Sequence, residues 1–153
     1  MFLKNIFTKK VGVVKLHADA KLPSQGSEEA AGWDVSYCGS EDLLLMPSST
    51  GLVGTGLSLV IPKGYHVEVR SRSGLAAKNS VSVLNSPGTI DSDYTGELKV
   101  ILRNNSPSTS FEIKKGDRIA QILLRKNVKT KFILVETHKE TSRGSGGFGS
   151  TGK

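Results

Sequence analysis

Alternating apolar and polar residues predict that most of this chain forms β-strands. The pattern is clearest at 65–70, where a tyrosine and two valines alternate with a histidine, a glutamate and an arginine. Such alternation is typical of a strand with one buried face and one exposed face. Similar short runs recur between clusters of Gly, Pro, Ser and Asp. They predict strands at 11–16, 32–37, 42–46, 52–61, 65–70, 81–84, 97–102, 111–113, 119–124 and 131–135.

The close spacing of these strands predicts the fold class. Many short strands separated by turn residues favour an all-β sandwich or barrel over a helical bundle. Only residues 73–78 have the pattern of a helix, with Ser73 as the N-cap and Lys78 in the last turn. Free backbone N–H groups at the start of this helix could hold a phosphate.

Composition divides the chain into one domain with two terminal extensions. The 153 residues are enough for one domain with a hydrophobic core, and the 17 glycines suit a turn-rich β-protein. The first residues are basic, whereas the end of the chain is rich in Gly and Ser, which is typical of a mobile tail. We expect a basic N-terminal extension at 1–10, a β-barrel domain at 11–136 and a flexible C-terminal arm at 137–153.

The net charge and the cysteine content limit which binding partners and which cellular environment the sequence favours. The net charge of +7 suits an anionic ligand, but the basic residues are scattered and no nucleic-acid motif accompanies them. A solvated basic surface is therefore favoured, without a nucleic acid or a membrane as partner. No apolar run approaches the roughly 20 residues of a membrane span, and the N-terminus does not resemble a signal peptide. The single cysteine, Cys38, cannot form an internal disulfide, which favours a reducing, cytoplasmic environment.

The segment 85–97 combines residues that nucleotide chemistry requires. Gly88 allows a tight turn and a close approach of the backbone to a ligand, because glycine lacks a Cβ. Asn85 offers both donors and an acceptor, as reading a nucleobase edge requires. Asp91 follows Ile90 in a further stretch that favours a strand, and a carboxylate held there is a candidate general base for water. Tyr94 supplies a flat ring that can pack against a sugar or a base.

Other polar residues are candidates for phosphate binding. Arg70 and Arg72 precede the short helix, and arginine matches phosphate geometry in two-point contacts. This segment alone nevertheless favours a helix with exposed arginines. In the next turn, the sequence favours an ion pair between Asp117 and Arg118. Gln121 lies among apolar neighbours, where an unpaired amide would be costly, so it needs a partner.

The C-terminal tail contains one arginine and one phenylalanine framed by glycines. Flexible linkers rarely carry this combination. Arg143 could bind a phosphate and Phe148 could stack on a base when the tail closes over a ligand. Composition alone favours a disordered tail.

Five segments, in order along the chain, resemble the motifs of the trimeric dUTPase family (deoxyuridine triphosphate nucleotidohydrolases). They are AAGWD at 30–34, RSGLA at 72–76, GTIDSDYTGE at 88–97, GDRIAQ at 116–121 and RGSGGFG at 143–149. The resemblance extends over residues 11–152, and five ordered motifs are far more specific than any single one. It implies a jelly-roll-like β-barrel and a homotrimer, in which each of three active sites takes residues from three subunits.

The resemblance also implies an activity. The enzyme would convert dUTP and water to dUMP and pyrophosphate with Mg²⁺, which limits uracil in DNA and supplies dUMP for dTMP synthesis. Asp91 would orient and deprotonate the water that attacks the α-phosphorus. The three phosphates and water would hold most of the Mg²⁺ coordination shell. Asp34 would support the metal's water shell or an arginine, without binding the metal directly.

The same resemblance implies three groups of substrate contacts. The residues that read uracil would be Asn85 and the backbone at Gly88, Thr89, Ile90 and Lys99. Tyr94 would pack beneath the deoxyribose and leave no room for a ribose 2′-hydroxyl. The residues that hold the phosphates would be Arg72, Ser73, Gly74 and Gln121. The arm would add Arg143 on the γ-phosphate and Phe148 on uracil, with Gly149 in the same motif.

Two departures and two alternatives accompany this resemblance. Trp33 stands where the family usually has tyrosine, and Thr95 where it often has arginine, but neither removes a predicted catalytic group. One alternative is a dCTP deaminase-like enzyme, which resembles the family in fold but needs a glutamate near the base. The other is a nucleotide-sensing regulatory protein that binds a protein partner. The segment around Asp91 and the complete arm motif favour hydrolysis.

Overall fold

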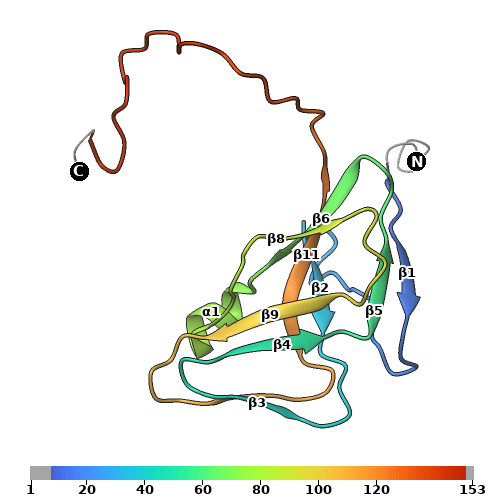
Figure 1. Cartoon of the computed structure of the whole chain (residues 1–153). Coiled ribbons are helices and arrows are strands. Elements are labelled where there is room, and N and C mark those ends of the chain that lie inside the picture. Colours follow the sequence, from blue (N-terminus) through green and yellow to red (C-terminus); the bar gives the residue numbers. More distant parts are fainter. Residues whose placement is uncertain (1–7, 151–153) are drawn as a thin grey trace.

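The computed structural model describes residues 8–150 and confirms the all-β class, with eleven strands and one short helix within that range (Figure 1). The strands are β1 (Gly12–Lys15), β2 (Trp33–Ser36), β3 (Leu43–Leu45), β4 (Thr50–Gly54), β5 (Leu57–Val60), β6 (Tyr65–Arg70), β7 (Val81–Val83), β8 (Gly88–Asp91), β9 (Lys99–Asn104), β10 (Phe111–Ile113) and β11 (Arg118–Lys126). The helix, α1, is Ser73–Asn79. The N-terminal extension expected at 1–10 lies mostly outside the described residues.

The strands form four antiparallel sheets, and strands that are distant in sequence are neighbours in space. The largest sheet has the order β2-β11-β6-β8, and a three-stranded sheet has the order β4-β9-β7. Two further pairs, β1-β5 and β10-β3, complete the barrel. Because β2 pairs with β11, polar residues of the first and fourth motifs come to lie on the same strand pair.

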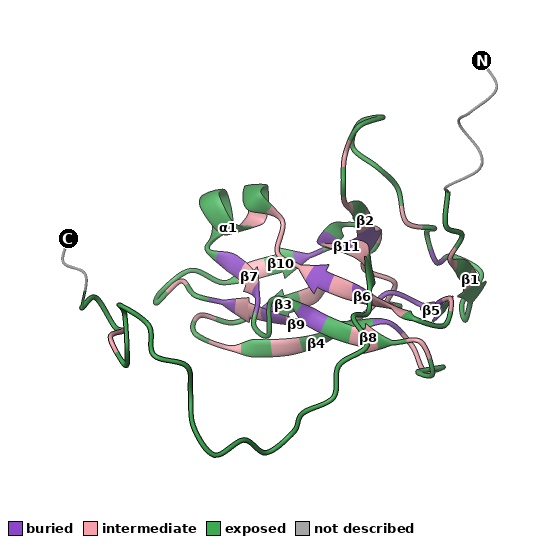
Figure 2. Cartoon of the chain, turned by 90° about the horizontal axis from the view of Figure 1, so that it is seen from above, coloured by how far each residue is buried: buried purple, intermediate pink, exposed green. Residues whose placement is uncertain are grey.

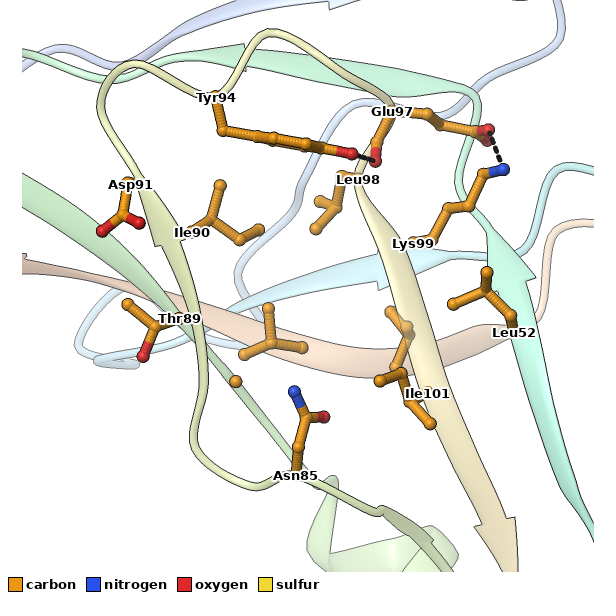
Figure 3. Close-up of a pocket in the computed structure, with 13 residues that line it drawn as sticks. Leu52, Asn85, Thr89, Ile90, Asp91, Tyr94, Glu97, Leu98, Lys99 and Ile101 are labelled. Carbon is orange, nitrogen blue, oxygen red and sulfur yellow. Dashed lines mark hydrogen bonds and ion pairs between the residues drawn. The ribbon is translucent and has the colours of Figure 1, made fainter.

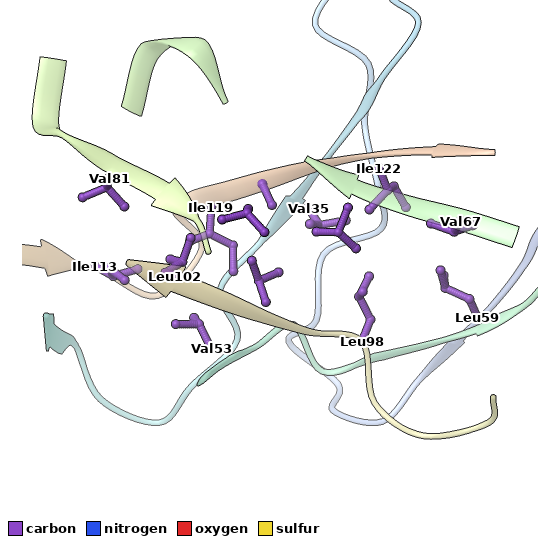
Figure 4. Close-up of a cluster of buried hydrophobic side chains, with 14 of the residues drawn as sticks. Val35, Val53, Leu59, Val67, Val81, Leu98, Leu102, Ile113, Ile119 and Ile122 are labelled. Carbon is purple, nitrogen blue, oxygen red and sulfur yellow. The ribbon is translucent and has the colours of Figure 1, made fainter. Parts of the chain in front are cut away.

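The hydrophobic core fills the space between the four-stranded and the three-stranded sheets (Figure 4). Along β6, Val67 and Val69 are buried, whereas the polar residues between and beside them are only partly covered (Figure 2). Val100 and Leu102 of β9 face them from the opposite sheet and are each 1% exposed. The alternation that predicted these strands is therefore the pattern of burial in the folded chain.

The expected strand at 52–61 is wrong as a single element, because the chain turns between β4 and β5. Gly56 has a φ of 66°, and a Cβ there would lie 2.9 Å from the Cys38 sulfur. Glycine is therefore required both for the left-handed backbone and for the space. Thr55 is fully buried and donates its hydroxyl to the Leu98 carbonyl at 2.7 Å. A polar residue is accommodated here because its bonding partner comes from a distant segment.

The expected strand at 131–135 is also wrong. This segment pairs with no strand of the described chain, and Phe132 and Leu134 are 95% and 101% exposed. Alternating apolar residues indicate that a segment can pair, but pairing needs a free strand edge within reach. Beyond β11 the chain instead runs away from the barrel (Figure 1).

The short helix forms where it is expected, but its capping differs. The N-cap residue is Arg72, which has extended backbone angles and makes no side-chain capping bond. Ser73 is therefore the first helical residue and does not act as the predicted cap. Within residues 8–150, no helix combines the length and apolar character that crossing a membrane would require.

Truncating a core leucine should destabilise the barrel strongly. Leu102→Ala should lower the free energy of unfolding by about 2–5 kcal/mol, because it removes buried contacts and leaves a cavity between the sheets. The matched control is Leu44→Ala, whose side chain is 59% exposed and whose loss should cost less than about 1 kcal/mol. Urea unfolding of both variants measures the difference, and equal losses would contradict the placement of the core.

Candidate active site

A cavity of about 300 Å³ lies where β8 and β9, strands of different sheets, are joined by a loop (Figure 3). It is lined by seven of the residues expected at the nucleoside and the water: Asn85, Gly88, Thr89, Ile90, Asp91, Tyr94 and Lys99. Its remaining lining is mostly apolar, from β4, β6 and β9. A mostly apolar cavity with a few convergent polar groups is typical of a small-molecule site.

Local geometry explains how these side chains enter the cavity. A Cβ on Gly88 would lie 3.2 Å from the Asn85 amide nitrogen, so glycine leaves room for that amide against β8. The Tyr94 hydroxyl donates to the Glu97 backbone carbonyl at 3.0 Å, which fixes the ring across the cavity (Figure 3). A Cβ on Gly96 would lie 2.4 Å from the same hydroxyl. The two glycines therefore make space for the polar groups at opposite ends of the cavity.

A second depression, of about 370 Å³, lies on the outward face of the four-stranded sheet. Its lining includes Asp34, Arg72, Ser73, Gly74 and Gln121, which are the residues expected at the phosphates and the metal. They come from β2, from the junction of β6 with α1, and from β11. The depression shares no lining residue with the first cavity.

Asp34 binds two guanidinium groups: that of Arg72, which lines this depression, and that of Arg118, which lies outside its lining. Arg72 donates through Nε to Oδ1 at 3.1 Å, and Arg118 donates through Nη1 to Oδ2 at 3.0 Å. Arg72 also donates to the Arg118 backbone carbonyl at 3.1 Å. One carboxylate between two cations orients Arg72 and leaves a net positive charge, which suits an anionic ligand. Of the two roles expected for Asp34, this geometry provides the support of an arginine.

The expected ion pair between Asp117 and Arg118 is wrong. The turn itself is present, with Gly116 at a φ of 86°, but Asp117 accepts from the Lys114 N–H at 2.9 Å instead. Arg118 pairs with Asp34 because β11 lies beside β2. The sequence around the turn contains no signal for this partner, since the pairing of the two strands is not local.

Gln121 has the partner that its surroundings require. Its amide nitrogen donates to the Ser71 carbonyl at 2.9 Å. A Cβ on Gly32 would lie 2.3 Å from its amide oxygen, so the first and fourth motifs fit together only because residue 32 is glycine. Beside it, Arg70 donates through Nε to Glu68 at 3.0 Å and holds the pKa of the Glu68 carboxyl below its ordinary value.

The arm residues contact neither depression in the single chain. The Phe148 side chain is 115% exposed, and Arg143 donates through Nε to the Gly146 carbonyl at 2.8 Å within the arm itself. Gly149 has a φ of 88°, which suits a tight turn beside the phenylalanine. The described part of the arm runs away from the barrel (Figure 1).

The fold and the two depressions define a nucleotide-binding β-barrel. The sequence identifies the family within this class. Residues 18–152 match the family model described as dUTPase, and the chain belongs to this family. The deoxyuridine 5′-triphosphate nucleotidohydrolase of Nautilia profundicola is 49% identical to it over 144 residues, which cover 94% of this chain and 99% of that protein.

Solved structures of dUTPases share the fold, which confirms the jelly-roll-like barrel. The dUTPase of Staphylococcus bacteriophage 80alpha with dUPNHPP has a TM-score of 0.85 and 26% identity, covering 95% of this chain and 100% of that chain. The dUTPase of phage phi11 of S. aureus, in which a structural Mg(II) ion is coordinated, has a TM-score of 0.75 and 23% identity, covering 84% and 98%.

A methyl group on Gly32 should weaken phosphate binding without unfolding the barrel. Gly32→Ala should displace the Gln121 amide and lower the affinity for inorganic tripolyphosphate by about tenfold, the loss of roughly one good hydrogen bond. The matched control is Gly26→Ala, since Gly26 lines the same depression but a Cβ there would meet nothing within 4 Å. Calorimetric titration compares the two, and equal affinities would contradict the role of the Gly32–Gln121 contact.

Proposed function

We propose that the chain hydrolyses dUTP to dUMP and pyrophosphate. The observation that carries this proposal is a single cavity lined by Asn85, Tyr94 and Asp91, in a chain of the dUTPase family. These side chains offer a base-reading amide, a ring for the sugar and a carboxylate for water. The activity would limit uracil in DNA and supply dUMP for dTMP synthesis.

The first cavity would select the nucleoside. The Asn85 amide can pair with the oxygen and N–H groups of uracil, together with the backbone at Gly88, Thr89, Ile90 and Lys99. A narrow pocket of this kind can exclude the amino group of cytosine and the methyl group of thymine. The Tyr94 ring, held by its bond to the Glu97 carbonyl, would lie beneath the deoxyribose and leave no space for a 2′-hydroxyl.

Asp91 would act on the attacking water. Its side chain is exposed at the edge of the cavity, where water can reach it (Figure 3). The carboxylate would take a proton from the water as the oxygen attacks the α-phosphorus, and the bond from the α-phosphorus to the bridging oxygen of pyrophosphate would break. A positioned base of this kind contributes about 10²–10⁴ in rate. The remaining catalysis would rest on positioning and charge neutralisation.

The second depression would hold the phosphates. Arg72, oriented by Asp34, would make two-point contacts with phosphate oxygens. Ser73 and Gly74 would add hydroxyl and backbone donors, and Gln121 would add its amide. Arg143 and Phe148 of the arm would close over the γ-phosphate and the uracil, and exclude bulk water from the reaction.

Mg²⁺ fits these residues as an ion that binds together with the substrate. Residues 8–150 contain no group of three His, Cys, Asp or Glu side chains that could hold a metal by themselves. Mg²⁺ retains much of its water and is commonly bound by phosphates with one or two carboxylates. When bound, it would neutralise charge on the phosphates. Asp34, whose two oxygens already accept from arginines, would act on it only through water.

The direction of β6 supports a homotrimer with shared sites. Gly88, expected at uracil, lies opposite Val69, whereas Asp91, expected at the α-phosphorus, lies opposite His66. A nucleotide that runs from Gly88 to Asp91 therefore points away from Arg72 of the same chain, which follows the other end of β6. Its terminal phosphates can meet this set of arginines only on another subunit. The exposed arm is free to reach a third subunit.

Neutralising Asp91 should abolish turnover while leaving substrate binding intact. Asp91→Asn keeps the size of the side chain but removes the base, so pyrophosphate release from dUTP should fall by at least about 10². Asp93→Asn is the matched control, since Asp93 is exposed nearby but does not line the first cavity. Release is measured with dUTP, dCTP, dTTP and UTP in the presence of Mg²⁺. Hydrolysis of dUTP by Asp91→Asn at the wild-type rate would contradict the role of Asp91 as the general base.

Removing the arm should lower turnover but preserve the barrel. A chain that ends after Ser142 lacks Arg143 and Phe148, so kcat for dUTP should fall by about two orders of magnitude because the phosphates are no longer positioned and shielded from water. The control is a chain that ends after Ser150, which keeps both residues. Circular dichroism and light scattering follow fold and assembly. Full activity without the arm would show that it is dispensable.

A further inference from the structure

Glu97 lines the first cavity and has a side chain that joins two separate elements. One carboxylate oxygen, Oε1, accepts from the Gly56 N–H at 2.9 Å, in the turn between β4 and β5. The other, Oε2, lies 3.6 Å from the Lys99 ammonium at the start of β9 (Figure 3). Gly56 is buried, and a buried N–H group without an acceptor would be costly. The carboxylate therefore has a defined partner on each side.

The neighbouring strand is shaped to admit this carboxylate. A Cβ on Gly54 would lie 2.5 Å from Glu97 Oε1, and its three nearest atoms would all belong to the Glu97 carboxyl group. Gly54 is not among the residues with a positive φ, so its backbone conformation does not require glycine. The missing side chain at residue 54 therefore serves to leave space for Glu97.

The same stretch of backbone forms one wall of the cavity. The Tyr94 hydroxyl donates to the Glu97 backbone carbonyl at 3.0 Å, and Lys99 follows two residues later in the lining. Ser58 donates its hydroxyl to the Thr95 carbonyl at 3.0 Å, which ties the loop between β8 and β9 to β5. A displacement of residue 97 would therefore shift both the ring expected beneath the sugar and the backbone expected beside the base.

We propose that Glu97 is a positioning residue that sets the sugar and base selectivity of the cavity by anchoring the loop between β8 and β9 to the Gly56 N–H. This inference rests on the proposed hydrolysis of dUTP and adds a residue outside the contacts assigned above. Glu97 does not touch the reacting atoms. Its acceptor oxygen holds the Tyr94 ring and the Lys99 backbone at the spacing that admits deoxyuridine and rejects a ribose 2′-hydroxyl.

Three variants separate the acceptor role from the charge. Glu97→Ala removes both contacts. Glu97→Gln keeps an oxygen of the same reach for the Gly56 N–H but removes the charge that faces Lys99. Gly54→Ala leaves Glu97 in the chain but places a methyl group where its carboxylate lies. The control is Glu112→Ala, because Glu112 forms a comparable pair with Lys114 at 3.7 Å on β10, with a side chain that is 57% exposed and outside the cavity.

Steady-state kinetics with dUTP and UTP tests the proposal. Glu97→Ala and Gly54→Ala should each raise KM for dUTP about tenfold and lower the ratio of kcat/KM for dUTP over UTP by a similar factor. The kcat for dUTP should change less than KM. Glu97→Gln should restore KM and selectivity to nearly wild-type values, and Glu112→Ala should match the wild type. In the double variant, Gly54→Ala should add no further loss to that of Glu97→Ala, because the carboxylate that the new methyl group would displace is no longer present.

Two results would overturn the proposal. One is unchanged KM and selectivity in a folded Glu97→Ala, or in Gly54→Ala if the first variant does not fold. The other is a Glu97→Gln variant as impaired as Glu97→Ala, which would assign the effect to the charge on Lys99 instead of the anchor. Failure of the wild type to hydrolyse dUTP would instead contradict the proposed function itself. The same assay, run on the wild type before any variant, separates that outcome from a failure of the proposal for Glu97.

Discussion

The antiparallel register of β6 with its two neighbours determines where the two depressions lie relative to each other. Toward β11, β6 pairs Arg70 with Gln121, which places the arginine-rich depression at the carboxyl end of β6. Toward β8, it pairs His66 with Asp91, which places the candidate base at the opposite end. A shift by one residue would exchange the buried and exposed faces of the strand. The buried valines of β6 therefore fix the core and the separation of the two depressions together.

Carboxylates around the site have two different environments. Asp34 accepts from two arginines, and Glu97 accepts from a buried N–H and faces an ammonium group. These groups hold other residues in place, and removing either would leave buried or charged partners unsatisfied. Asp91 instead lies exposed at the edge of the cavity. The difference agrees with the roles proposed for these acids, since Asp34 and Glu97 hold neighbouring groups in place and Asp91 is accessible to water.

Local patterns in the sequence predict the strands of the barrel, but not the contacts between distant motifs. The alternation in β6 and β9 is visible along the chain because burial follows the period of two. Most residues around the first cavity lie within the contiguous stretch 85–101, so their proximity also follows from the sequence. The contact of Asp34 with Arg118 depends on the pairing of β2 with β11 and has no local signal. The turn between β4 and β5 has one in Gly56, with its φ of 66°, but the bond of Thr55 to Leu98 beside it is not local.

An exposed apolar segment that contains Phe132 and Leu134 precedes the arm, whereas Arg143 and Phe148 lie near its end, and this order suits a closing segment. Phe132 and Leu134 expose their whole side chains in the single chain, and burial of each against another subunit would contribute about 1.5–3 kcal/mol. Such a segment would fix the arm to the assembly before any nucleotide binds. The tip of the arm, with Arg143 and Phe148, would then lose conformational freedom only when a ligand is present. Such anchoring would raise the effective concentration of the tip at the site, while weak contacts of the tip would let the product leave.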